Sequence, residues 1–453
     1  MGNQLPAGGR PEYTRMTGVS PHADTVGWRV LRLLRERGVG AVYGDSQSGM
    51  PVTTEAPREL ARLLAAAHRR VHRRPAAAWS DGVLFLGAAA AAEPADIGLV
   101  AGDVTGLQDV LSLAVNKAET GRSVSVRLDL DLAEPAGSWQ LPRPPGPAAE
   151  FDVTSTIDRL ESATSPLVLA GPGVVDAGAV PGLHALAAAG RLGVLNTWGA
   201  KGIFPWSSPH HWATIGLQQD DFHLAGLAAA DLIVATGLDE CESPARRWQL
   251  ADHITVAPDL LGELAISYRS DADFKPMPAL RVSLASATQR GWSVDSGPLP
   301  PSKVTSTYAA WIAGRAGLVV AEPGTAGFWI ARTVGTTILD TVIVPGEPVP
   351  EGFAIACALV ARLAEPGRPV LAVLDRVPMH ADVALLELAD RLRVAVPVEA
   401  WVEDGDALDY TVHVERVCAA MHSSASSVMT LATDSRQLSE MIDIAGPVVA
   451  WRP

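Results

Sequence analysis

The stretch that decides the fold runs from residue 166 to residue 244. It opens PLVLAGPGVV at 166–175, continues as NTWGAKGIFPWSSPHHWATIGLQ at 196–218, and closes on ADLIVATGLDECESP at 230–244. The pattern predicts apolar strands at 167–170 and 232–236 and another strand that ends at Thr197, with glycine soon after each strand. Apolar strands that alternate with helices and run into glycine loops are typical of a parallel α/β sheet with a ligand-facing edge.

Three short motifs occur in this stretch in a fixed order. They are Gly171-Pro172-Gly173, then GAKGIFP at 199–205, then ADLIVATG at 230–237. This order resembles the central domain of thiamine-diphosphate enzymes of the acetohydroxyacid synthase and pyruvate decarboxylase group, which reads G-x-G, then GKG-F, then ADL-V-A-G. The resemblance implies an α/β fold of three parallel-sheet, Rossmann-like (flavodoxin-like) domains, known as the thiamine-diphosphate-binding fold.

Length and composition agree with three domains. The chain has 453 residues, which at roughly 150 residues per domain predicts about three. A net charge of −14 argues against a nucleic-acid partner, because binding phosphates requires clustered cations. The sequence shows neither an apolar run of 18 residues nor a signal segment, so we expect a cytoplasmic protein with no membrane partner. The three cysteines form no CxxC, and a reduced protein without structural disulfides is expected.

Composition shifts along the chain predict its domain boundaries. A helix that ends before Gly38, followed by a short strand at 39–44, resembles the start of the family's pyrimidine-binding domain. The proline-rich stretch 134–147 predicts one linker, and the looser Ser- and Pro-containing segment 285–302 predicts a second. The resulting boundaries are 1–20 for a disordered lead-in, 21–147 for a shortened pyrimidine-binding-like domain, 151–284 for the central domain, and 303–453 for a diphosphate-binding-like domain.

The resemblance also indicates where a cofactor would bind. In the family, the diphosphate and a Mg²⁺ ion are held by a motif that starts GDG at a strand end and finishes NN about 25 residues later. Here the corresponding strands end Leu374-Asp375-Arg376 and Val402-Glu403-Asp404, so the spacing matches, but the glycines and asparagines are replaced and the cofactor motif is degenerate. The implied residues are Asp375, Arg376, Gly171, Gly173 and Gly352 for cofactor binding, and Asp375, Glu403 and Asp404 for the metal.

The replaced residues leave several readings open. Asp375 with Glu403 or Asp404 can still supply oxygen ligands to Mg²⁺ or Ca²⁺. Leu374 and Arg376, however, add side chains where the phosphates need close backbone contact, although an arginine can also pair with a phosphate. The alternative without a ligand is that Asp375 is a strand-end residue in a salt bridge with Arg376 or Arg391.

The first domain also departs from the family at the catalytic carboxylate. The family places a glutamate soon after the second strand, where it activates the cofactor's aminopyrimidine. The corresponding region, 60–74, contains no acid, and Glu59 just before it is the remaining candidate at a shifted register. His68 and His72 lie one helical turn apart, but the neighbouring arginines favour a solvated basic face over a metal pair. His210 and His211 are expected in a polar loop or at an inter-domain cleft.

These features predict two classes of function. The first is a thiamine-diphosphate-dependent enzyme homologue of lyase or transferase type, a decarboxylase or carboligase acting on 2-oxo acids or related acyl donors. The second is a catalytically inactive scaffold or regulatory subunit, or a subunit whose site a partner chain completes. Because no G-x-G-x-x-G is complete, FAD or ADP in the central domain is not expected. Family geometry implies a homodimer or homotetramer, and the apolar segments 61–67, 87–92 and 355–363 are predicted at its interface.

Overall fold

The computed structural model describes residues 25–46, 50–87, 95–119, 122–134, 153–270, 273–313 and 316–451. The predicted lead-in at 1–20 and nearly all of the first linker lie outside these ranges. The chain divides into two compact units, one of residues 1–145 with 359–367 and the other of residues 146–358 with 368–453.

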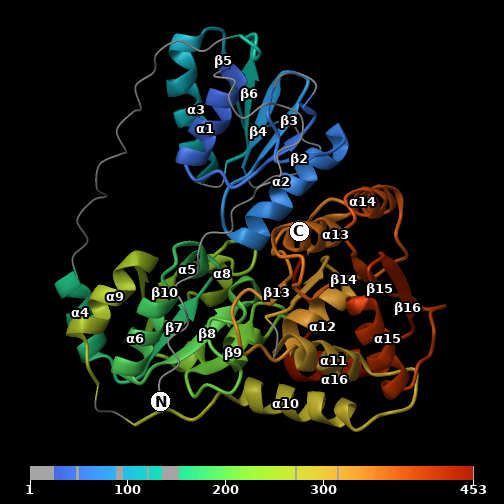
Figure 1. The fold of residues 1–453 in the computed structure, drawn as a ribbon. Coiled ribbons are helices and arrows are strands. Elements are labelled where there is room, and N and C mark those ends of the chain that lie inside the picture. The colour runs from blue at the N-terminus through green and yellow to red at the C-terminus, as the bar shows by residue number, and fades with distance from the viewer. Residues whose placement is uncertain are drawn as a thin grey trace, which may run out of the picture. The chain divides into compact units, whose positions relative to one another are not determined.

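The N-terminal unit contains three helices and a mixed sheet in its described residues (Figure 1). Its elements are α1 (Val26–Glu36), β1 (Val42–Gly44), β2 (Thr54–Glu55), α2 (Arg58–His72), β3 (Ala77–Ser80), β4 (Val83–Leu86), β5 (Ile97–Ala101), α3 (Val104–Glu119) and β6 (Val124–Leu128).

The strand order of this sheet is β2-β1-β3-β4-β6-β5. Within this sheet, β4 departs from the parallel arrangement and runs antiparallel to both β3 and β6. The reason is a two-residue hairpin at Asp81-Gly82, whose φ angles of 50° and 76° are both positive. An Asp-Gly pair between apolar runs is a strong hairpin signal, because a tight turn of this type needs left-handed backbone at both positions.

The second unit carries the remaining elements. They are α4 (Val153–Ser162), β7 (Pro166–Ala170), α5 (Gly173–Asp176), α6 (Val180–Gly190), β8 (Gly193–Thr197), η2 (Trp198–Ala200), β9 (His211–Ile215), α7 (Asp221–Leu224), η3 (Leu227–Ala229), β10 (Leu232–Thr236), α8 (Ala245–Trp248), β11 (His253–Val256), η4 (Pro258–Leu260), α9 (Leu261–Ser267), α10 (Ala279–Trp292), α11 (Pro301–Ala313), β12 (Leu318–Ala321), α12 (Thr325–Thr333), β13 (Val342–Ile343), α13 (Phe353–Ala364, whose end belongs to the first unit), β14 (Val370–Leu374), α14 (His380–Arg391), β15 (Pro397–Trp401), α15 (Tyr410–His422), β16 (Ser427–Leu431) and α16 (Arg436–Ala445).

Two five-stranded parallel sheets organise this unit. The central sheet has the order β11-β10-β7-β8-β9, and the C-terminal sheet has the order β13-β12-β14-β15-β16. Counted along the chain, these are a Rossmann-like 3-2-1-4-5 order and a flavodoxin-like 2-1-3-4-5 order. With the N-terminal sheet they confirm the predicted α/β fold of three mostly parallel sheets. The strand order reverses between β7 and β10 in one sheet and between β12 and β14 in the other, and ligands of such sheets bind at these switch points.

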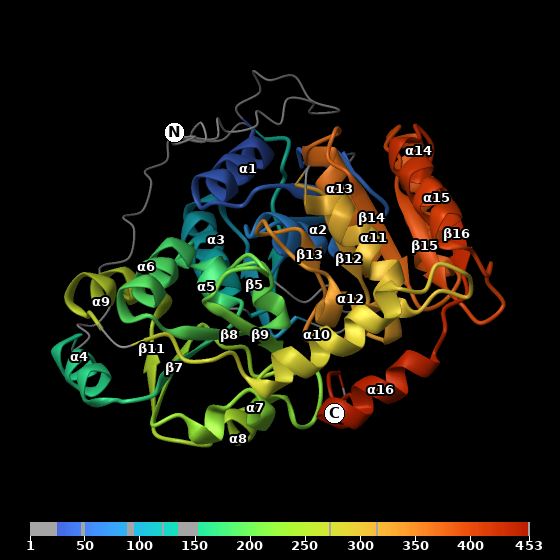
Figure 2. The ribbon, with the colours of Figure 1, turned by 90° about the horizontal axis from the view of Figure 1, so that it is seen from below.

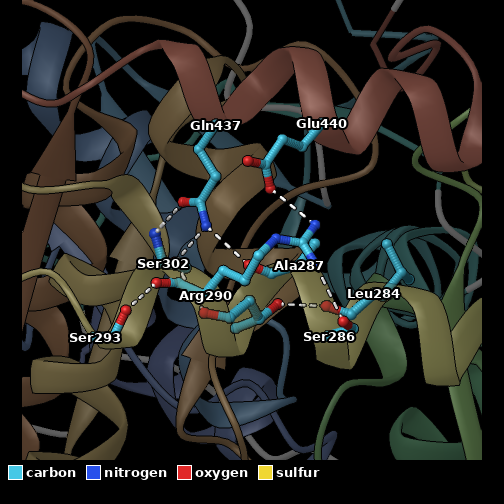
Figure 3. Close-up of polar contacts among 9 residues, drawn as sticks. Leu284, Ser286, Ala287, Arg290, Ser293, Ser302, Gln437 and Glu440 are labelled. Carbon is cyan, nitrogen blue, oxygen red and sulfur yellow. Dashed lines mark hydrogen bonds and ion pairs between the residues drawn. The ribbon is translucent and has the colours of Figure 1, made fainter.

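The predicted second linker is largely helical. Helix α10 runs to Trp292 and lies against α11 and α16 (Figure 2). Gln437 of α16 accepts a hydrogen bond from the Ser302 backbone N–H at 3.1 Å and donates to the Ala287 carbonyl at 3.3 Å (Figure 3). Leu280, Leu284 and Ala287 of α10 are buried in the core, so this helix is stabilised by the packing of one apolar face together with its contacts to α16.

One core joins the two sheets of the second unit. Leu169 and Ile233 of the central sheet belong to the same buried cluster as Val319 and Val373 of the C-terminal sheet. The two sheets are therefore packed as one body. Among the described helices, none is both long and apolar enough to cross a membrane.

Candidate functional site

The switch point of the C-terminal sheet lies between β12 and β14. The loop after β12 contains Glu322 and Gly324, and Asp375 and Arg376 follow β14 directly. Because β12 and β14 are paired in parallel, their carboxyl ends meet at the same edge. This edge brings together the β12 loop and two of the residues that the sequence assigned to the cofactor.

Asp375 binds the N-terminus of helix α12. Its Oδ1 accepts a hydrogen bond from the Ala326 N–H at 2.7 Å, and its Oδ2 accepts one from the Thr325 N–H. Gly324 makes this contact possible, because a Cβ at that position would lie 2.0 Å from Asp375 Oδ2. The free N–H groups at a helix N-terminus attract anions. The Asp375 carboxylate therefore occupies the place on α12 where an anionic ligand would bind.

Arg376 is held by two carboxylates other than Asp375. Its guanidinium donates to Glu322 Oε2 at 2.9 Å and to Asp382 Oδ2. Burial alone would lower the Arg376 pKa, but the hydrogen bond to Asp382 and the charge of Glu322 raise it overall. The guanidinium is thus already neutralised inside the chain. The predicted salt bridge of Asp375 with Arg376 is not formed in the described residues, because Asp375 caps α12 instead.

Two neighbouring helices at the same edge also face carboxylates. The backbone of Gly352 and Ala354 at the start of α13 lies close enough to Glu322 to lower its pKa, so the predicted cofactor contact Gly352 faces a carboxylate. Glu351 Oε1 accepts from the Ala381 N–H in the first turn of α14 at 2.7 Å. Burial raises the pKa of Glu322 to about 7, against the opposing effect of Arg376. A carboxylate of the chain therefore accepts hydrogen bonds from the N-termini of α12 and α14, and Glu322 lies near the N-terminus of α13.

A pocket of about 460 Å³ opens beside the N-terminus of α12. Most of its lining residues are apolar, and they come from the β12–α12 loop, from α12, from the β13–α13 loop, and from α16 and the segment that follows it. They are Pro323, Gly324, Thr325, Phe328, Pro348, Leu438, Val448, Ala450 and Trp451. Trp451 is fixed there by a hydrogen bond from its Nε1 to the Pro345 carbonyl at 2.6 Å. The pocket suits a small, largely apolar group rather than a diphosphate.

The predicted metal ligands are not gathered into a site. Glu403 and Asp404 lie in an exposed turn after β15, whereas both Asp375 oxygens accept backbone hydrogen bonds. Across the described ranges, no group of three or more His, Cys, Asp or Glu side chains is arranged to hold a metal ion. The metal set stays a prediction of the resemblance. As folded, the residues of this edge do not fit a Mg²⁺-diphosphate group, because its anion position is filled and its arginine is paired.

The switch point of the central sheet is closed by backbone packing. The Gly173 N–H donates to the Gly237 carbonyl at 2.8 Å, and a Cβ on Gly171 would lie 2.3 Å from the same oxygen. A Cβ on Gly237 would lie 2.4 Å from the Val174 nitrogen. Gly171 and Gly173 are therefore glycines because two loops pack directly against each other, and this contact accounts for them without a ligand.

The candidates of the N-terminal unit lie apart from any such cluster. Glu59 is exposed in the first turn of α2, and residues 60–72 continue this helix. The expectation of a solvated face around His68 was wrong, since His68 is buried and its Nδ1 lies 2.9 Å from the Tyr43 hydroxyl. Burial lowers the His68 pKa to about 3. His211 is likewise buried, at the start of β9, and not in a polar loop.

Comparison with known families agrees with the central fold. Residues 153–260 match the family model described as thiamine pyrophosphate enzyme, central domain, and this match runs from α4 through η4. None of the curated proteins matches the chain significantly. The match identifies residues 153–260 as similar to the central domain of thiamine pyrophosphate enzymes.

Proposed function

We propose that this chain is a non-catalytic member of its family, which keeps the fold as a scaffold or regulatory subunit and works without thiamine diphosphate. The observation that carries the proposal is the Asp375 carboxylate on the first two N–H groups of α12. An internal anion at that position performs the structural role of a diphosphate and also excludes one.

The electrostatics support exclusion of the diphosphate. A phosphate oxygen about 4 Å from the Asp375 carboxylate would be repelled by roughly 1 to 4 kcal/mol, depending on how well solvent screens the pair. If Asp375 moved away, its two backbone hydrogen bonds would be lost as well. Arg376 does not offset this cost, because it would first have to leave Glu322 and Asp382.

The N-terminal unit supports the same proposal. Glu59, the remaining candidate for the catalytic carboxylate, is exposed on α2. A cytoplasmic homodimer or homotetramer remains part of the proposal. Its predicted interface segment 61–67 is already mostly buried within one chain, and α2 packs on β1 and β3, so assembly would have to use other surfaces.

The second candidate is an active thiamine-diphosphate enzyme that acts on 2-oxo acids or related acyl donors. The family match and the pocket beside α12 favour it. This function would require Asp375 to leave α12 and Glu403 or Asp404 to reach the metal.

Calorimetric titration with thiamine diphosphate and Mg²⁺ separates the two candidates. We expect no saturable heat for the natural chain at millimolar ligand, and no consumption of pyruvate. We expect Asp375→Ala to take up inorganic pyrophosphate without added metal, because the α12 N–H groups become free. Glu403→Ala serves as the control and should behave like the natural chain. Tight binding of the cofactor by the natural chain, lost in both variants, would refute the proposal and establish the enzyme.

A further inference from the structure

Two buried cations of the second unit have nitrogen atoms without a hydrogen-bond partner. Lys201, in the loop after η2, is 4% exposed, and Arg332 of α12 is 2% exposed. Lys201 Nζ and Arg332 Nε are each buried, and neither finds an acceptor among the described residues. Buried donors are normally paired, so two unpaired donors in one neighbourhood indicate a missing acceptor.

The surroundings of Lys201 are positively charged. Its Nζ lies 4.9 Å from the centroid of the Trp206 ring, and the Arg281 guanidinium lies 5.2 Å from the same centroid. Arg281 donates to neutral acceptors, among them His211 Nδ1 at 2.6 Å and the His211 carbonyl at 2.8 Å. Burial, together with Arg281 and Lys201, lowers the His211 pKa to about 3, so this imidazole is neutral.

The charges of the cluster do not balance. Arg332 is neutralised by Asp221, whose two oxygens each lie 2.8 Å from Arg332 Nη2. Among the described residues, neither Lys201 nor Arg281 forms an ion pair, and of the two Lys201 is the one that is fully buried. Burial lowers the Lys201 pKa to about 7, with further lowering by Arg332 and Arg281. Burying an uncompensated charge is costly, and a bound anion would offset that cost by supplying both an acceptor and a negative charge.

We propose that Lys201, Arg281 and Arg332 form a binding site for one small monovalent anion, of the size of chloride. Because Lys201 and Arg332 are almost fully buried, the anion would have to be small and able to shed its water. Lys201 follows the central strand β8, and Arg332 belongs to α12, which packs on the C-terminal strands β12 and β14. The anion therefore ties the two sheets of the second unit together, and its binding should stabilise the fold.

Thermal unfolding in sodium chloride and in sodium gluconate at equal ionic strength tests the site. Chloride should raise the melting temperature by several degrees, since a ligand at 100 times its Kd stabilises the native state by about 2.7 kcal/mol. The effect should be larger at pH 6 than at pH 9, because Lys201 is protonated below a pKa of about 7. Lys201→Met should abolish the chloride dependence. The control Lys275→Met, at an exposed position, should retain it.

A crystal of the natural chain soaked in bromide gives a second readout that needs no variant. We expect an anomalous peak within hydrogen-bond distance of Lys201 Nζ. Absence of that peak would overturn the proposal. Equal chloride dependence in the natural chain and in Lys201→Met would overturn it too.

Discussion

Breaking the buried ion pair between Arg332 and Asp221 should destabilise the second unit far more than breaking a surface ion pair. The two side chains are 1% and 0% exposed. Arg332 also donates to the Thr214 carbonyl at 2.8 Å, and Asp221 Oδ2 accepts from the Gln218 N–H at 3.0 Å. Because Thr214 lies in β9, the edge strand of the central sheet, and Arg332 lies on α12, the pair joins the central and C-terminal halves of this unit.

Asp221→Asn removes the negative charge and almost preserves the side-chain volume. Arg332 would then be buried without a counter-charge, which typically costs about 3 to 5 kcal/mol. We expect the upper part of this range, because Lys201 and Arg281 already leave excess positive charge nearby. At roughly 2 to 4 °C per kcal/mol, the melting temperature should fall by on the order of 10 °C.

The matched control is the surface ion pair of Arg290 and Glu440 (Figure 3). Its atoms lie 3.1 Å apart, but the side chains are 58% and 46% exposed. Glu440→Gln should therefore cost less than about 1 kcal/mol, and high salt should reduce even that. Urea unfolding followed by circular dichroism measures both variants. If Asp221→Asn cost no more than Glu440→Gln, the reasoning from burial would be refuted.

Three further predictions concern single positions. Asp375→Ala should lower the free energy of unfolding by about 1 kcal/mol, since α12 loses its N-terminal acceptor; a chemical denaturation curve unchanged from the natural one would contradict the capping role. Gly171→Ala should cost about 1 to 3 kcal/mol because its Cβ would meet the Gly237 carbonyl at 2.3 Å, whereas Gly367→Ala, with nothing within 4 Å, should be neutral in the same denaturation assay. His68 has a folded pKa of about 3, below its unfolded value of 6.5, so its contribution to stability is complete above pH 6.5 and is lost as the pH falls toward 3. Between pH 6.5 and pH 3, His68 should therefore lower the free energy of unfolding by up to about 1.4 kcal/mol for each pH unit. His68→Gln should flatten the curve of unfolding free energy against pH. An imidazole proton resonance of His68 that titrates near pH 6.5 would contradict this prediction.

Local patterns in the sequence were sufficient to predict the strands and the glycine turns of the second unit. Apolar runs such as 232–236 are strands because a buried parallel strand exposes neither face to water, and this signal needs no knowledge of neighbouring elements. Glycines such as Gly171 mark close backbone approach for the same local reason. The order of these motifs was sufficient to indicate the family, which the match over 153–260 confirms.

The long-range partners were decided only by the tertiary structure. Asp375 was visible in the sequence as a strand-end carboxylate, but its acceptance of N–H groups from Thr325 and Ala326, about fifty residues away, depends on β12 and β14 being neighbours. The balance of charge around Lys201 likewise follows from which side chains packing brings together. A sequence determines which residues favour burial or a turn, because these preferences are local. The partner of a buried charge is set by the packing of distant segments. At the carboxyl edge of the C-terminal sheet, the pairing of Asp375 with α12 decides whether that edge is open to a ligand.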